Sequence, residues 1–147
     1  MTPDPRLVIG DVAGRIMQVL APDLQSPYLY GTASLMAAVL GMMVEEWDRA
    51  ADRLAEENAA IRTLFAQAAP LAPGGLSARL GDLSKAADLD LKVSTLQSAN
   101  NTLRGALIDL QAWSEDQTGS AAMALNVAIW AELSTSTERR RLSATPF

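Results

Sequence analysis

Apolar residues recur every three or four positions along most of this chain, which is the spacing of helices that bury one face. The longest such pattern covers residues 34–69, and no proline occurs between Pro27 and Pro70. We therefore predict one long helix over residues 27–69. Within it, residues 35–44 carry no charge and are apolar on every face. A helix that is apolar all round must be buried all round, so this stretch is expected at the centre of a bundle or at a subunit interface.

Proline and glycine mark the ends of the other predicted helices. Asp4-Pro5 is a typical helix start, with an acidic cap and proline at the first helical position. Pro22 ends that helix, because proline disfavours helical geometry in the residue before it. Residues 70–75 form the clearest break in the chain, and a second break follows at Gly119. The predicted helices cover residues 5–21, 27–69, 87–117 and 120–142, with a short helix at about 76–84.

The pattern over residues 87–117 is the most regular in the chain, with seam positions at alternating steps of four and three from Leu89 onwards. A polar residue, Asn100, occupies one position of this seam. A single polar residue in a seam commonly fixes the register of helices or the number of copies. Alternatively, Asn100 lies at a helix end or binds water, and both interpretations stay open. The seam of the long helix is also interrupted once, by Glu57 and Asn58.

These patterns predict an all-α protein, arranged as an antiparallel up-and-down bundle of four main helices in a single domain over residues 1–147. The start of the helix at 120–142 is apolar on most faces, as residues 35–44 are. Two such helices are hard to bury in one four-helix bundle, because each helix of a bundle keeps an outer face. We therefore predict a homodimer, the commonest oligomer. The predicted interface or apolar pocket comprises Met36, Leu40, Met43, Trp47, Trp113, Met123, Ile129 and Trp130.

Composition narrows the functions that the chain can have. With 12 basic and 17 acidic side chains, the net charge of −5 argues against binding to nucleic acid. The sequence has no histidine and no cysteine, which removes the commonest general base, the commonest metal ligand and thiol chemistry. Residues 45–57 are rich in carboxylates, but interleaved arginines favour a solvated, salt-bridged face over a metal site. We expect no enzymatic activity, no cofactor and no metal.

One stretch raises the question of a membrane span. Residues 24–44 hold no charged residue, which is nearly the length of about 20 residues that a bilayer requires. The flanking charges are Asp23, Glu45 and Glu46, without the nearby lysine or arginine that sets a membrane orientation. We therefore predict no membrane span. Because the N-terminal residues lack the basic start and apolar core of a secretory signal, we expect a cytoplasmic protein.

Two functions remain open. The first is a non-catalytic interaction or structural protein that self-associates as a homodimer, with another protein as a further candidate partner. The alternative is a module that binds an apolar small molecule or acyl chain between helices, next to the tryptophans and methionines. Met36, Met42 and Met43 are either core filler or an adaptable binding surface. The arginine run at 139–141 either complements a helix C-terminus or contacts an anion.

Overall fold

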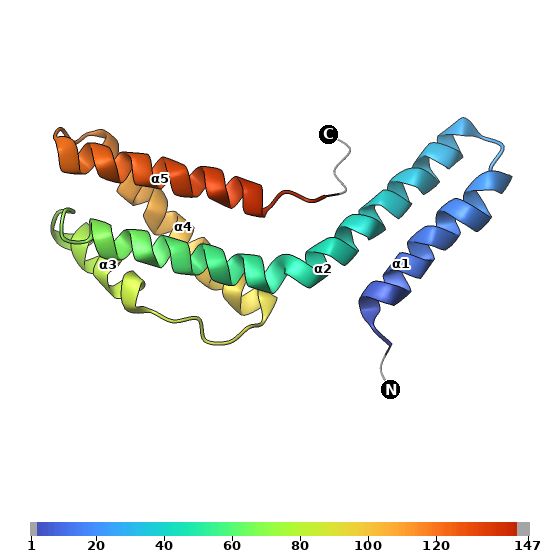
Figure 1. Ribbon diagram of the computed structural model, residues 1–147, viewed down its shortest axis with the longest axis horizontal. Coiled ribbons are helices and arrows are strands. Elements are labelled where there is room, and N and C mark those ends of the chain that lie inside the picture. The colour runs from blue at the N-terminus through green and yellow to red at the C-terminus, as the bar shows by residue number, and fades with distance from the viewer. Residues whose placement is uncertain (1–2, 144–147) are drawn as a thin grey trace. The chain divides into compact units, whose positions relative to one another are not determined.

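The computed structural model describes residues 3–143, and over this range the chain is helical with no strand (Figure 1). The predicted all-α class is confirmed. The antiparallel up-and-down topology stays a prediction. A π-helical turn (Ile16–Leu20) and a 3-10 turn (Ala21–Asp23) follow the first helix. The α-helices of the described range are α1 (Pro5–Arg15), α2 (Pro27–Ala68), α3 (Gly74–Lys85), α4 (Val93–Glu115) and α5 (Ser120–Arg139).

The first helix ends earlier than the sequence predicts. α1 stops at Arg15, and the backbone widens into a π-helical turn in which the N–H of Ala21 donates to the carbonyl of Ile16, five residues back. Pro22 has no N–H with which to continue the α-helical ladder. The predicted single helix over residues 5–21 is therefore an α-helix followed by irregular turns.

The helix predicted at 87–117 begins later, at Val93. Asp88 lies outside it because its carboxylate binds Arg62 of α2, with contacts of 2.6 and 3.1 Å. Asp90 accepts a hydrogen bond from the backbone N–H two residues further on, at 2.9 Å. These interactions hold the connecting segment away from helical geometry. They involve a residue of α2 that is far away in sequence, so the periodicity of the segment alone does not reveal them.

The contacts of the chain cluster into two compact units. The first unit contains the residues up to 50 together with those from 141 on, and the second unit contains residues 51–140. The helix α2 contributes its first part to one unit and its second part to the other. The single domain over residues 1–147 stays a prediction.

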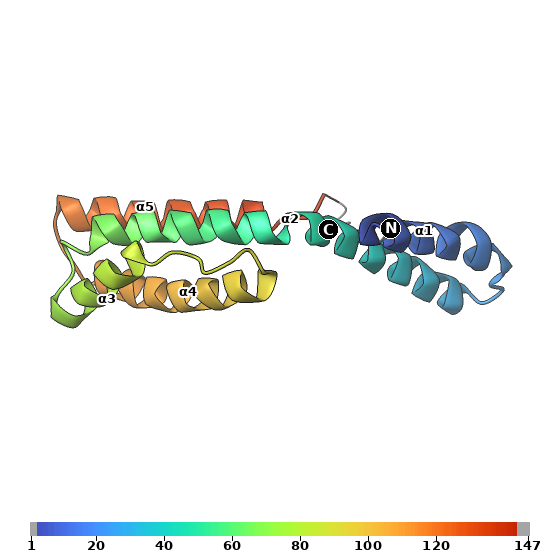
Figure 2. The ribbon, with the colours of Figure 1, turned by 90° about the horizontal axis from the view of Figure 1, so that it is seen from below.

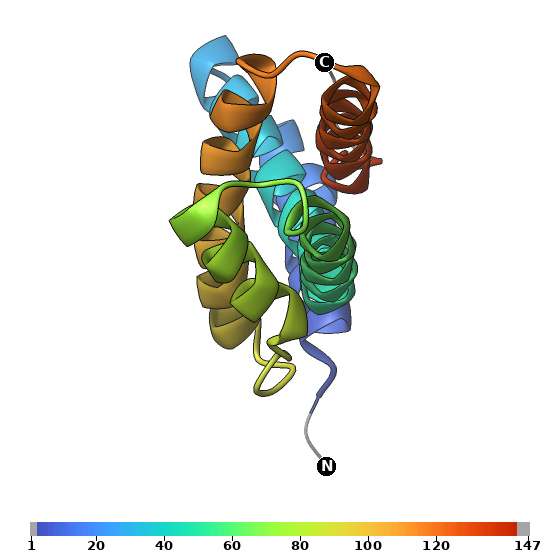
Figure 3. The ribbon, with the colours of Figure 1, turned by 90° about the vertical axis from the view of Figure 1, so that its left-hand side faces the viewer.

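The core of the second unit lies between the second part of α2, α3, α4 and α5 (Figure 3). Six of the eight seam positions predicted from Leu89 onwards are buried. The exceptions are Leu89, which lies before α4 and is 91% exposed, and Val93, at the start of α4, which is 46% exposed. The core residues are Ile61, Leu64, Phe65, Ala68, Leu80, Leu103, Ala106, Leu107, Leu110, Leu125 and Ile129.

In the first unit, α1 and the first part of α2 lie side by side as a helical hairpin (Figures 1 and 2). The predicted start of α1 is confirmed: Asp4 accepts a hydrogen bond from the N–H of Arg6 at 2.9 Å, and Pro5 occupies the first turn. The side chain of Arg6 also pairs with Asp48 of α2. The buried apolar residues of the hairpin are all alanines, namely Ala21, Ala33, Ala37 and Ala50.

Burial of residues 35–44 at the centre of a bundle is a prediction that the structure corrects. Leu35, Met36 and Met43 are each more than half exposed. The physical reason is that the single neighbouring helix α1 covers only one side of α2, whereas this stretch is apolar on every side. The other predicted location, a subunit interface, stays a prediction.

Ile129 and Trp130 are neighbours on α5 with opposite surroundings, and their replacement tests the core. Ile129→Ala removes a side chain with no exposed surface and should lower the free energy of unfolding by about 2–5 kcal/mol. Trp130→Ala removes a side chain that is 54% exposed and should lower it by less than about 1 kcal/mol. Urea denaturation followed by circular dichroism measures both values. Equal losses would contradict the described core.

Candidate functional site

Large apolar side chains cover the outside of the hairpin. Thirteen of them within residues 5–50 are exposed, and the exposed fraction of Tyr28 reaches 80%. Single exposed apolar residues are normal on soluble proteins, whereas a concentration of them marks an interaction site. This surface, called the hairpin face below, comprises Leu7, Val8, Val12, Val19, Leu20, Tyr28, Leu29, Tyr30, Leu35, Met36, Val39, Met43 and Trp47.

The spacing of four of these residues places them on one side of α2. Leu29, Met36, Met43 and Trp47 are separated by seven, seven and four residues. Such steps return to nearly the same direction around a helix. The buried Ala33 and Ala37 are offset from this line around the helix, whereas Ala50, seven residues after Met43, continues the line and is buried. These four residues, called the α2 stripe below, form a continuous apolar line along the hairpin.

Four of the eight predicted site residues lie in the first unit. Met36, Met43 and Trp47 belong to the hairpin face, and Leu40 is half-buried. Of the two interpretations of the methionines, core filler does not apply to Met36 and Met43 in the single chain, because both are more than half exposed. Met42 is half-buried. The predicted site thus includes three of the eight residues that α2 contributes to the hairpin face, and their role in binding stays a prediction.

The other four predicted site residues lie in the second unit and have different surroundings. Ile129 is fully buried and is part of the core, so it is not a surface residue that a second copy reaches. Trp113 is half-buried and packs against the same core. Met123 and Trp130 are exposed on α5. Some apolar residues of α5 thus lie in the core and others lie on the surface.

The helix α2 is long and apolar enough to span a membrane, judged by length and composition alone. An 18-residue window of this helix has a mean hydropathy of 1.4, and 11% of that window is buried. A core helix of a soluble protein passes the same test but is mostly buried. The low burial means that the single chain leaves this stretch largely uncovered. The absence of a membrane span stays a prediction.

A buried carboxylate joins three helices of the second unit. Glu57 of α2 has no exposed surface, and it accepts hydrogen bonds from Arg104 of α4 at 2.6 Å and from Arg140, directly after α5, at 2.9 Å. Burial by itself raises the pKa of Glu57, but the hydrogen bonds from Arg140 and Arg104 outweigh it, and the pKa lies below its ordinary value. Glu57 is therefore charged at neutral pH.

Two asparagines extend this polar cluster into the core. Asn58 and Asn100 are both fully buried, and the amide of Asn100 donates to the side-chain oxygen of Asn58 at 3.0 Å. Asn58 donates to Asp88 at 3.1 Å. Hydrogen bonds from Arg62 hold the pKa of Asp88 below its ordinary value. Asn100 thus lies inside α4 and not at a helix end, while its role in setting the register stays a prediction.

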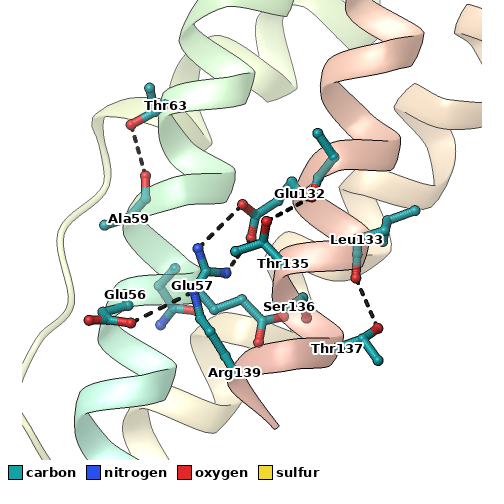
Figure 4. A network of polar contacts seen from close by, with 12 residues as sticks. Glu56, Glu57, Ala59, Thr63, Glu132, Leu133, Thr135, Ser136, Thr137 and Arg139 are labelled. Carbon is teal, nitrogen blue, oxygen red and sulfur yellow. Dashed lines mark hydrogen bonds and ion pairs between the residues drawn. The ribbon is translucent and has the colours of Figure 1, made fainter. Parts of the chain in front are cut away.

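The arginine run at 139–141 is engaged in internal contacts. Figure 4 shows Arg139 at the end of α5 between Glu132 and Glu56. The guanidinium lies 2.7 Å from the Glu132 carboxylate and 3.7 Å from that of Glu56. Arg140 binds Glu57, as described above. These contacts favour the interpretation in which the arginines hold the end of α5, rather than one in which they contact an external anion.

The second unit also contains a hollow of about 290 Å³, formed by α2, α4 and the segment around Ala86. Leucine and alanine side chains line it together with Arg62, Thr95 and Ser98. None of the predicted tryptophans and methionines lines this hollow. An apolar ligand held next to those residues therefore stays a prediction.

Within residues 3–143, no group of three or more acidic, histidine or cysteine side chains is arranged to hold a metal ion. The chain matches none of the protein-family models, curated proteins or solved structures with which it was compared.

Glu57→Gln removes the buried charge and keeps the shape of the side chain. We expect it to lower the free energy of unfolding at pH 7 by about 1–3 kcal/mol, because it weakens hydrogen bonds from two arginines that keep part of their surface in water. The matched control is Glu56→Gln. That neighbouring carboxylate is 59% exposed, and its loss should cost less than about 0.5 kcal/mol.

The same two variants test how the stabilisation by Glu57 depends on pH. Because the pKa of Glu57 is lower in the folded chain than in the unfolded chain, its contribution is complete above the unfolded value of about 4.3. It is lost as the pH falls through the folded value. Thermal unfolding should show a smaller loss of stability on acidification for Glu57→Gln than for Glu56→Gln. Identical pH profiles would contradict a stabilising charge at Glu57.

Proposed function

We propose that this chain is a non-catalytic interaction protein that self-associates, and that a second copy covers the hairpin face. The observation that carries the proposal is the imbalance within the hairpin. Its buried apolar residues are four alanines, while thirteen large apolar side chains are exposed. Burial of such side chains is the main favourable term in protein association. A monomer leaves this surface in water and lacks the favourable free energy of burying it.

The hairpin face is large enough for a specific interface. An aromatic side chain offers about 150–250 Å² of surface, and an aliphatic side chain offers somewhat less. At exposed fractions of 44–80%, the thirteen side chains together expose on the order of 1,000 Å². A stable interface buries about 800 Å² on each partner. Part of the exposed apolar surface is therefore enough for one specific interface with a second hairpin.

The charge distribution supports a second copy of the chain as the partner. Residues 24–44 carry no charge, whereas the whole chain has a net charge of −5. Two copies thus meet through the neutral part of the hairpin without bringing like charges together at its centre. A two-fold contact uses the same patch on both copies, so no complementary surface elsewhere is needed. The non-catalytic part of the proposal rests on the lack of histidine and cysteine in the sequence.

Met36→Glu tests the proposal. The side chain is 57% exposed in the single chain, so a glutamate there leaves folding intact. In a dimer it places a charge in the apolar contact of each copy, and the dissociation constant should rise at least about 100-fold. Sedimentation equilibrium measures the constant, and circular dichroism checks the helical content.

The matched control is Ile108→Glu, which changes an exposed apolar residue of α4 in the second unit. It should leave the dissociation constant unchanged. A natural chain that sediments at 15.6 kDa at all concentrations would overturn the proposal. If both variants raise the dissociation constant equally, the copies do not meet through the hairpin face.

A further inference from the structure

We propose that the two copies pair through the α2 stripe in antiparallel orientation, with Met36 of each copy against Met43 of the other. This inference rests on the proposed function, because it specifies how the two hairpins of a dimer meet. It concerns the four residues Leu29, Met36, Met43 and Trp47, each of which is about half exposed or more.

The α2 stripe has the length and spacing of a helix-packing seam. It extends over residues 29–47, which is about 27 Å of helix at the usual rise. Steps of seven residues suit two helices that cross at a small angle, because a seam of this period keeps facing a partner helix over several turns. Val39 lies close to the middle of the stripe and is also exposed. The stripe is therefore long enough to support a contact on both sides of a two-fold axis near Val39.

Charge decides the orientation of the second copy. The N-terminal end of the stripe belongs to the uncharged residues 24–44, whereas Glu45, Glu46 and Asp48 surround Trp47 at its other end. Arg49 pairs with Glu45 and Arg6 pairs with Asp48. Three carboxylates against two guanidinium groups leave this end with an excess of negative charge. In a parallel pair these carboxylates would lie next to the same carboxylates of the second copy, and like charges repel. In an antiparallel pair they lie next to the uncharged end of the second stripe. The antiparallel arrangement thus separates the two acidic ends by the length of the seam.

The register follows from the spacing of the two methionines. Met36 and Met43 lie on either side of Val39 and Leu40. With a two-fold axis at that point, Met36 of one copy meets Met43 of the other, and the reverse contact forms on the opposite side of the axis. Methionine is flexible and polarisable, so both contacts can pack without a demanding shape match. Met36 and its own equivalent are then about 10 Å apart along the seam.

The natural chain contains no cysteine, so introduced cysteines report on the contact without background. Met36→Cys and Met43→Cys are prepared separately, and each is oxidised alone and after mixing and exchange of subunits. A disulfide requires Cα atoms within about 7 Å. We expect disulfide-linked dimers in the mixture and none in either single variant. Ile108→Cys, mixed with each of them, is the control and should give no linked dimer.

The outcomes distinguish a failure of the orientation from a failure of the proposed function. Linked dimers in both single variants would overturn the antiparallel orientation and leave the dimer intact. A doubled mass without any disulfide would overturn the α2 stripe as the contact. A single-chain mass in every sample would overturn the orientation and the proposed function together. The same mass combined with co-sedimentation on phosphatidylcholine vesicles would assign the hairpin face to lipid instead. Circular dichroism of each variant confirms that the helices are retained.

Discussion

The hairpin has more large apolar side chains than one neighbouring helix can cover. Two packed helices turn only one side of each towards the other, whereas α2 is apolar on several sides between residues 35 and 44. Ala33 and Ala37 are buried, while Leu35, Met36 and Met43 are exposed. The packing of α1 against α2 therefore leaves the hairpin face exposed. The function that we propose rests on this exposed surface.

The second unit has no such imbalance at its centre. Leucines and isoleucines from α2, α3, α4 and α5 form a continuous core. The polar residues within it have charged or amide partners: Glu57 binds Arg104 and Arg140, and Asn58 binds Asn100. Buried polar groups that are bonded in this way favour one arrangement of helices over others, because any shift would leave a charge or an amide without its partner. The second unit thus has a core of its own, while Met123, Val127 and Trp130 of α5 stay exposed.

Features set by local sequence could be predicted. The cap at Asp4, the break at residues 70–75 and the seam of α4 follow from short-range patterns, and the structure reproduces them. The uncharged stretch of α2 also predicted a helix that is apolar on every face. Periodicity alone could not tell whether that stretch lies in a bundle centre or at a subunit interface, because both locations satisfy the same pattern.

Features set by distant partners could not be predicted. The late start of α4 depends on the pair between Asp88 and Arg62, and the partners of Glu57 come from two other helices. The sequence showed a polar interruption at Glu57 but gave no signal that joined it to the arginines. Ile129 and Trp130 lie in a segment that is apolar on most faces, so the pattern could not assign one to the core and the other to the surface. The exposed residues of α1, Leu7, Val8 and Val12, were not predicted as surface residues, because periodicity does not show which apolar positions of a helix lie in the core.

The fluorescence of Trp47 tests the central claim most directly, because this side chain is 63% exposed in the single chain. Trp113→Phe combined with Trp130→Phe leaves Trp47 as the only tryptophan. If a second copy covers the hairpin face, the emission is blue-shifted at high protein concentration and moves to longer wavelength on dilution, while circular dichroism shows the helices retained. Emission at the long wavelength of a water-exposed tryptophan at every concentration would contradict the claim.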